Sequence, residues 1–213
     1  MQIFWYGHSC FLIKTNTGKR ILMEPFESNI EYNINFPKCD VTTLSHNHFS
    51  NSYIDKVGIN TKLLNHHGTF DMNTLKVYGI TTFCDKLKGA KRGKNIIFIF
   101  KIENYTICHL GNLGHIPDIN ILDRLQGIDI LFIPISSQFT LDPIEASHLC
   151  DLILPKYIIP MNYKTLDSSI PLNDLEKFLF CNKNIYKINS SVLNIDDLKL
   201  KSLCNIILMN TYS

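Results

Sequence analysis

Short apolar runs, separated by polar and turn-forming residues, recur along most of the chain. Alternating apolar and polar positions predict half-buried strands, and short unbroken apolar runs predict fully buried strands. The strands expected on this basis are residues 2–7, 10–14, 20–24, 41–44, 62–65, 75–78, 80–83, 96–102, 105–110, 128–134, 157–159, 186–188 and 204–209. The first half of the chain is therefore expected to be rich in strands.

Helical signals are concentrated in the second half. Residues 117–125, 141–154 and 172–181 are predicted helices, with Pro117 near the start of the first and Asp142 as the N-cap of the second. A short helix is also expected at residues 53–57, after a polar loop. The combination predicts one α/β domain spanning residues 1–213, with helices outside packed sheets.

Composition and charge exclude several classes of function. The 213 residues are 45% hydrophobic, enough for a sizeable core, and the net charge of +2 does not suggest a nucleic acid or an anionic membrane as partner. Apolar stretches stay shorter than the roughly 18 residues that a membrane-spanning helix needs. The start, MQIFWYGHSC, does not resemble a signal peptide. The seven scattered cysteines then suggest reduced thiols in a cytoplasmic protein.

Two histidines give the first chemical signal. His46 and His48 follow the apolar run 41–44 with one residue between them, so at a strand end both imidazoles point the same way. Imidazole is the commonest metal ligand in proteins, and the pair is either half of a metal site or two ordinary loop histidines. His66 and His67 are adjacent and would face opposite sides of a strand, so they are not expected to act as a pair.

Several strand ends carry polar residues in an order that resembles a known family. The segments are Tyr6-Gly7-His8-Ser9-Cys10-Phe11, Met23-Glu24-Pro25-Phe26, residues 46–51, Cys84-Asp85, residues 111–115 and Met161-Asn162-Tyr163-Lys164. Together with Gly-x-x-Arg-Gly-Lys-Asn (89–95) and His-Leu-Gly-x-Leu-Gly-His (109–115), this set resembles the metallo-β-lactamase fold superfamily from residue 2 to about 165. It is most similar to the small bacterial members described as zinc-dependent hydrolases. The resemblance implies a four-layer αββα sandwich with a metal site at one sheet edge.

The same resemblance implies seven metal-ligand positions, five of which are substituted in this chain. The seven positions hold His46, His48, Ser50, Asn51, Cys84, Asn112 and Asn162. In the family the first loop reads His-x-His-x-Asp-His, and histidine, aspartate and histidine occupy the last three positions. Glu24 stands where the family has the aspartate of an Asp-Pro-Phe turn. The positions that would bind only the second metal in the family therefore hold substituted or uncharged residues in this chain.

These substitutions limit what metal the chain can hold. Zinc is bound by thiolate, imidazole or carboxylate, which Asn112 and Asn162 do not supply. We therefore expect at most one zinc per chain, at His46, His48 and Cys84, with an open position for water. Ser50 replaces the carboxylate that would orient this water. Hydrolysis by a metal-activated hydroxide should therefore be weak or absent.

Other polar residues are expected to support or line the site. They are His8, Glu24, Asp85, His115, Tyr163 and Lys164. Asn112 and Asn162 are expected to hydrogen-bond to each other and to loop amides. The basic loop that carries Lys91, Arg92 and Lys94 is interpreted as solvated, with phosphate binding near the site as the less favoured interpretation. Gly89 and Gly93 in this loop are expected to permit the turn and are not expected to form a phosphate-binding loop.

Several functions remain open from the sequence. The first is a hydrolase-family protein with a degenerate metal centre, a pseudoenzyme that binds an unidentified small molecule or protein and carries no metal. The alternative is a mononuclear zinc hydrolase of a small ester, phosphoester or lactone that acts through His46, His48 and Cys84. A third is a structural or redox-sensitive zinc site with Cys84 as its labile thiol.

Overall fold

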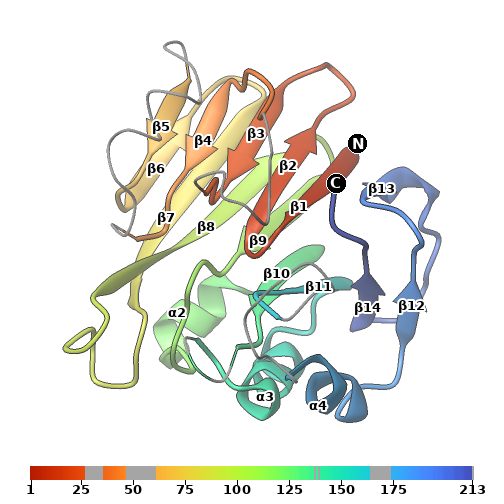
Figure 1. Cartoon of the computed structure of the whole chain (residues 1–213). Helices are drawn as coiled ribbons and strands as arrows, with labels where there is room; N and C mark the ends of the chain where they lie inside the picture. Colours follow the sequence, from red (N-terminus) through yellow and green to blue (C-terminus); the bar gives the residue numbers. More distant parts are fainter. Residues whose placement is uncertain (27–35, 47–60, 137, 139, 164–173, 213) are drawn as a thin grey trace.

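The computed structural model describes residues 1–26, 36–46, 61–136, 138, 140–163 and 174–212. Within them, two β-sheets pack against each other, and helices lie on the side of the second sheet away from the first (Figure 1). This mixed α/β arrangement confirms the expected fold class. The expected helix at 53–57 lies outside the described residues.

The first sheet has the strand order β13-β1-β2-β3-β4-β5. Its strands are β1 (Gln2–Gly7), β2 (Cys10–Lys14), β3 (Arg20–Met23), β4 (Val41–Thr43), β5 (Lys62–Leu64) and β13 (Val192–Asn194). β1, β2 and β3 are antiparallel neighbours, whereas β4 runs parallel to β3. The carboxyl ends of β3 and β4 therefore meet at one edge of this sheet.

The second sheet has the order β12-β14-β11-β10-β9-β8-β7-β6. Its strands are β6 (Gly68–Asp71), β7 (Leu75–Phe83), β8 (Lys94–Ile102), β9 (Tyr105–His109), β10 (Ile130–Pro134), β11 (Tyr157–Met161), β12 (Ile185–Lys187) and β14 (Asn205–Leu208). β9, β10 and β11 are parallel, so the loops that follow them emerge at one edge.

The described helices are α2 (Ile119–Arg124), α3 (Pro143–Ile153), α4 (Asp174–Phe180) and the 3₁₀ turn η1 (Ile195–Asp197). The start of α3 is a capping box, because Asp142 accepts from the Glu145 N–H and the Glu145 side chain accepts from the Asp142 N–H. The N-cap expected at Asp142 is thus confirmed. None of the helices in the described segments is long and apolar enough to cross a membrane.

Aromatic side chains join the two sheets. Phe11 of β2 lies fully buried between the sheets, with its ring centroid 4.4 Å from that of Phe132 on β10. Trp5 of β1 also stacks on Phe11, with the ring centroids 5.9 Å apart. This apolar layer fixes the first sheet on the second and brings their strand-end loops together.

The strand predictions fail at three places. Residues 75–78 and 80–83 belong to one continuous strand, β7, in which a Cβ at Gly79 would lie 2.7 Å from the carbonyl oxygen of His66. Gly79 therefore permits a close approach of two chain segments and does not end a strand. β6 and β13 were not expected, because they are short and their strand conformation comes from pairing with β7 and β1.

Candidate functional site

The sequence-predicted positions gather where strands of both sheets end. Glu24 follows β3, His46 follows β4, Cys84 follows β7, Asn112 follows β9 and Asn162 follows β11. Polar groups at the carboxyl ends of strands are a common arrangement for a binding site. These described residues therefore lie where the resemblance places a metal site.

Glu24 is a buried carboxylate that organises the start of the first loop. Its side chain is 3% exposed, and its two oxygens accept from the N–H of Ser45 at 2.6 Å and from the Ser45 hydroxyl at 2.8 Å. The residue has φ +49°, an uncommon conformation for a side-chain-bearing residue. The Nδ1 atom of His46 lies 3.1 Å from Ser45 Oγ and 3.7 Å from Glu24 Oε2. Glu24 and Ser45 therefore orient the His46 ring.

The side-chain amide of Asn112 lies against the His46 ring, with its nitrogen 2.9 Å from Nε2 and 3.4 Å from Nδ1. Asn112 Oδ1 accepts from the side-chain amide of Asn162 at 3.1 Å. The expected hydrogen bond between the two asparagines is confirmed. Three ligand positions of the resembled family thus lie in contact with one another.

Asn95 and His109 position Asn112, and sequence reasoning did not assign them this role. The buried Asn95 accepts from the Asn112 N–H at 2.8 Å and donates to Thr82 Oγ1 and to the Leu110 carbonyl. His109 Nδ1 accepts from the Gly111 N–H at 3.1 Å. Both residues belong to the two glycine-containing motifs at 89–95 and 109–115, which is the signal that pointed to them.

Gly111 lets the loop after β9 come close to the first loop. A Cβ there would lie 2.5 Å from both Asn95 Oδ1 and Ser45 Cβ, and its φ is +61°. A side chain at this position would push Asn112 away from His46. The motif glycine therefore serves the approach of the two loops.

Cys84 is buried and its thiol donates to the carbonyl oxygen of Lys94 at 3.5 Å. Burial raises the pKa of this thiol to about 11; Arg92 opposes the rise, and Asp85 and Glu24 add to it. Near neutral pH the side chain is therefore a neutral thiol. Among the described residues, no group of three His, Cys, Asp or Glu side chains is placed to hold a metal ion.

Asp85 organises the loop between β7 and β8. Its two oxygens accept backbone hydrogen bonds from residues 87, 89, 91 and 92 at 2.7–3.1 Å. Although desolvation raises the pKa of Asp85, these four bonds prevail and lower it below its usual value. Gly89 and Gly93 have φ near +80° in the same loop. The expected turn role of these glycines is confirmed.

The other residues that were predicted to support the site make separate contacts around it. The His8 carbonyl accepts from the Trp5 indole and from the Asn162 N–H, each at 3.2 Å, and so places Asn162. His115 donates through Nδ1 to the Ile116 carbonyl at 2.9 Å. Tyr163 is buried against Trp5, and burial raises its pKa. The predicted residues His48, Ser50, Asn51 and Lys164 lie outside the described residues.

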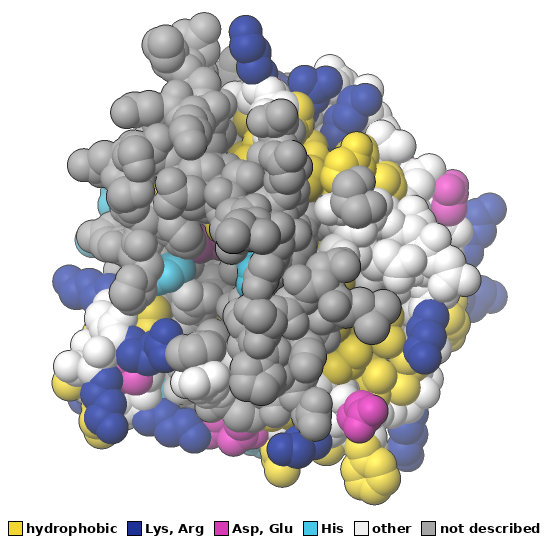
Figure 2. Space-filling view, viewed as in Figure 1, with side chains coloured by type: hydrophobic (Ala, Val, Ile, Leu, Met, Phe, Trp, Pro, Cys, Tyr) yellow, Lys and Arg dark blue, Asp and Glu magenta, His cyan; other side chains and the backbone are white. Residues whose placement is uncertain are grey.

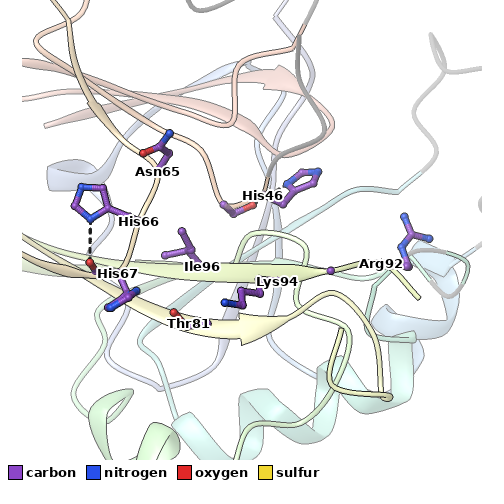
Figure 3. Close-up of a pocket in the computed structure, with 10 residues that line it drawn as sticks. His46, Asn65, His66, His67, Thr81, Arg92, Lys94 and Ile96 are labelled. Carbon is purple, nitrogen blue, oxygen red and sulfur yellow. Dashed lines mark hydrogen bonds between the residues drawn. The ribbon is translucent and has the colours of Figure 1, made fainter. Parts of the chain in front are cut away.

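A cavity of about 490 Å³ opens beside His46 (Figure 3). Thr81 of β7 and Ile96 and Lys94 of β8 form one wall, and Arg92 lies at one end. In Figure 2, Lys and Arg side chains gather at the lower left, over the connection between β7 and β8, with some Asp or Glu surface among them and histidine surface nearby. The wall is thus basic.

His66 and His67 both line this cavity, at the end away from Arg92 (Figure 3). The two residues do not lie on a strand, as the expectation had assumed, because β5 ends at Leu64 and β6 begins at Gly68. Their rings nevertheless point in different directions (Figure 3). His66 Nδ1 hydrogen-bonds to the His67 carbonyl oxygen at 3.0 Å.

Comparison with known proteins gives consistent matches. The model of the beta-lactamase superfamily domain matches residues 2–162. A UPF0173 metal-dependent hydrolase of Geobacillus thermodenitrificans is 28% identical over 201 residues, which cover 78% of this chain and 86% of the relative. Another from Methanosarcina barkeri is 26% identical, with 78% and 85% covered.

A solved structure extends the similarity to the whole chain. It is described as a Zn-dependent hydrolase of the metallo-beta-lactamase superfamily from Thermotoga maritima. The two chains are 30% identical, each is covered to 99%, and the TM-score is 0.80. The similarity therefore includes the segment after residue 165, which carried no motif in the sequence.

Proposed function

We propose that this chain, which belongs to the metallo-β-lactamase-fold family of UPF0173 metal-dependent hydrolases, keeps the family's fold but lacks its hydrolytic activity. On this proposal the protein is a pseudoenzyme whose former catalytic edge binds a small molecule or a protein. The family implies a metal, so the proposal depends on whether the residues present suit one.

The observation that carries the proposal is the contact of the Asn112 amide with the His46 ring, at 2.9 Å from Nε2 and 3.4 Å from Nδ1. A histidine binds metal through an unprotonated ring nitrogen, and here a neutral amide lies beside both ring nitrogens. Asn162 in turn donates to Asn112, so each side chain satisfies the next. Polar groups that a metal would otherwise bind are paired without one.

Charge supports the same conclusion. A two-metal centre carries about four positive charges, which carboxylate ligands offset in part. Asn112 and Asn162 are neutral amides, and by sequence Ser50 and Asn51 are neutral as well. Glu24 is the carboxylate that remains, and both of its oxygens already accept hydrogen bonds from Ser45. The donor set therefore does not fit a second metal, and no hydrolytic step is assigned to it.

The competing proposal is one zinc at His46, His48 and Cys84 that hydrolyses a small ester, phosphoester or lactone. The relatives described as metal-dependent hydrolases favour it. Against it, the Cys84 thiol donates to the Lys94 carbonyl. Zinc binding there would have to replace the thiol proton and move Asn112 away from the His46 ring.

Elemental analysis distinguishes the two proposals. Protein purified without chelator, exposed to excess zinc and desalted, should retain well under one zinc per chain and show no hydrolysis of ester, phosphodiester or lactone substrates. About one zinc per chain, lost in His46→Ala and Cys84→Ser and kept in the exposed-site control Cys181→Ser, would establish the zinc site. Together with hydrolysis of one of these substrates it would overturn the pseudoenzyme, whereas zinc without hydrolysis would indicate the structural or redox-sensitive site.

A restoration variant tests the account of the substitutions. It combines Ser50→Asp, Asn51→His, Cys84→His, Asn112→Asp and Asn162→His. The rebuilt donor set should raise the metal content toward about two per chain, because imidazoles and carboxylates replace neutral amides. If the metal content stays at the wild-type level, the loops no longer place these positions for ligation.

A further inference from the structure

We infer that the basic cavity beside His46 binds a small molecule through a phosphate group. The inference deepens the proposed function and rests on it, since it names the ligand class of a site that binds without hydrolysis. It is carried by the residues that line the cavity: Arg92, Lys94, His46, His66 and His67.

The charge of the lining indicates an anion. Arg92 and Lys94 carry formal positive charges, and no carboxylate is among the described lining residues. Within the described part of the chain, Lys94 forms no ion pair. A phosphate monoester carries about −1.5 to −2 charges at pH 7, which matches two cationic side chains better than a single carboxylate does.

The loop that carries Arg92 is preorganised but offers no backbone cradle. The N–H groups of Lys91 and Arg92 are already bound by Asp85, and the Gly93 N–H is bound by the Gly89 carbonyl. An anion must therefore be held by side chains. Arg92 provides a planar guanidinium that can donate two hydrogen bonds to phosphate, and Lys94 provides a point charge.

The rest of the cavity suits the body of a small ligand. Its volume of about 490 Å³ is in the range of small-molecule sites. Figure 3 shows Arg92 at one end and His66 and His67 at the other, with His46 between them. The Nδ1 atom of His66 is bound to the His67 carbonyl, so its Nε2 edge remains for a polar group of the ligand.

Titration with inorganic phosphate tests the inference. Wild-type protein is stripped with chelator and titrated by calorimetry at constant ionic strength, with acetate as the second probe. We expect saturable phosphate binding and much weaker acetate binding. Arg92→Gln and Lys94→Gln should each weaken phosphate binding by about tenfold, as expected for loss of one charge-assisted hydrogen bond. The matched control is Lys91→Gln, on the same loop but outside the cavity lining, which should change affinity less than about twofold.

Several outcomes would overturn the inference. They are absence of saturable binding, equal binding of acetate, equal weakening by all three substitutions, or binding that appears only after zinc is added. Thermal unfolding of each variant checks that the fold is intact. Because the titration uses metal-free protein and measures no turnover, its failure leaves the metal analysis unaffected. Conversely, a bound zinc with hydrolysis would overturn the proposed function without removing the phosphate site.

Discussion

His109 is a buried histidine held in one neutral tautomer. Its Nε2–H donates to the Ser9 carbonyl at 3.0 Å and its Nδ1 accepts from the Gly111 N–H at 3.1 Å. Burial lowers the pKa of His109 below its usual 6.5, which outweighs the opposing effects of Glu24 and of the hydrogen bond to Ser9. A proton on Nδ1 would remove the acceptor that holds Gly111. The geometry of the Asn112 loop therefore depends on a neutral imidazole.

Stability should fall in mild acid because of this residue. The unfolded chain binds a proton at His109 near pH 6.5, before the folded protein does. The contribution of neutral His109 is thus complete above pH 6.5 and is lost as the pH falls below it, by up to about 1.4 kcal/mol per pH unit. Urea unfolding between pH 5 and 8 should show this slope in the wild type and a smaller one in His109→Gln. The exposed-site control His148→Gln should keep the wild-type slope, and equal slopes in all three proteins would refute the assignment.

The β7–β8 loop is an element organised by one side chain. Asp85 accepts four backbone N–H groups, and Lys86 forms an ion pair with Glu145 at the start of α3. The loop has few apolar contacts of its own, because most of its residues are exposed. Asp85 therefore contributes to the order of the loop, and with it to the position of Arg92 at the cavity, together with backbone bonds such as that from the Gly93 N–H to the Gly89 carbonyl.

Removing this carboxylate should loosen the loop selectively. In Asp85→Ala, amide hydrogen exchange at Lys91 and Arg92 should accelerate by about tenfold or more, while amides of α3 keep their wild-type rates. The affinity for phosphate should also fall in Asp85→Ala, because Arg92 is no longer held at the cavity. Lys91→Gln serves as the control, since its side chain makes none of these bonds. Unchanged exchange in Asp85→Ala would show that other contacts order the loop.

At the scale of the whole molecule, the site exists because two sheets pack face to face. Phe11 contacts Phe132 across the interface, and its ring lies 6.2 Å from that of His109. The buried core contains residues of both sheets in one continuous cluster. We therefore expect both sheets to unfold together, in one cooperative transition.

Truncation of Phe11 should cost a large part of the stability. Phe11→Ala leaves a cavity between the sheets and should lower the free energy of unfolding by about 3–5 kcal/mol. Phe180→Ala removes the same side chain at the end of α4, where it is 92% exposed, and should change the free energy by less than about 0.5 kcal/mol. Urea denaturation measures both values, and Phe11→Leu provides a milder variant if the alanine variant does not fold. A loss at Phe11 no larger than at Phe180 would contradict the role of this contact.

Much of the fold was predictable because its signals are local. Buried runs such as 130–134 and the cap at Asp142 depend on residues close together in sequence. β6 and β13 were missed because their pairing partners, not their own residues, make them strands. The break expected at Gly79 was wrong for the related reason that the segment packed against it is not adjacent in sequence.

The features of the candidate site can also be divided into those that the sequence shows and those that depend on the tertiary structure. The sequence by itself determined which side chains stand at the candidate positions, among them the neutral Asn112, Asn162 and Ser50. Only the tertiary structure decided that Asn112 lies against the His46 ring and that His66 and His67 share a cavity with Arg92. These contacts join residues dozens of positions apart. They form because the packing of two sheets brings separate strand ends together, and no local pattern encodes that packing.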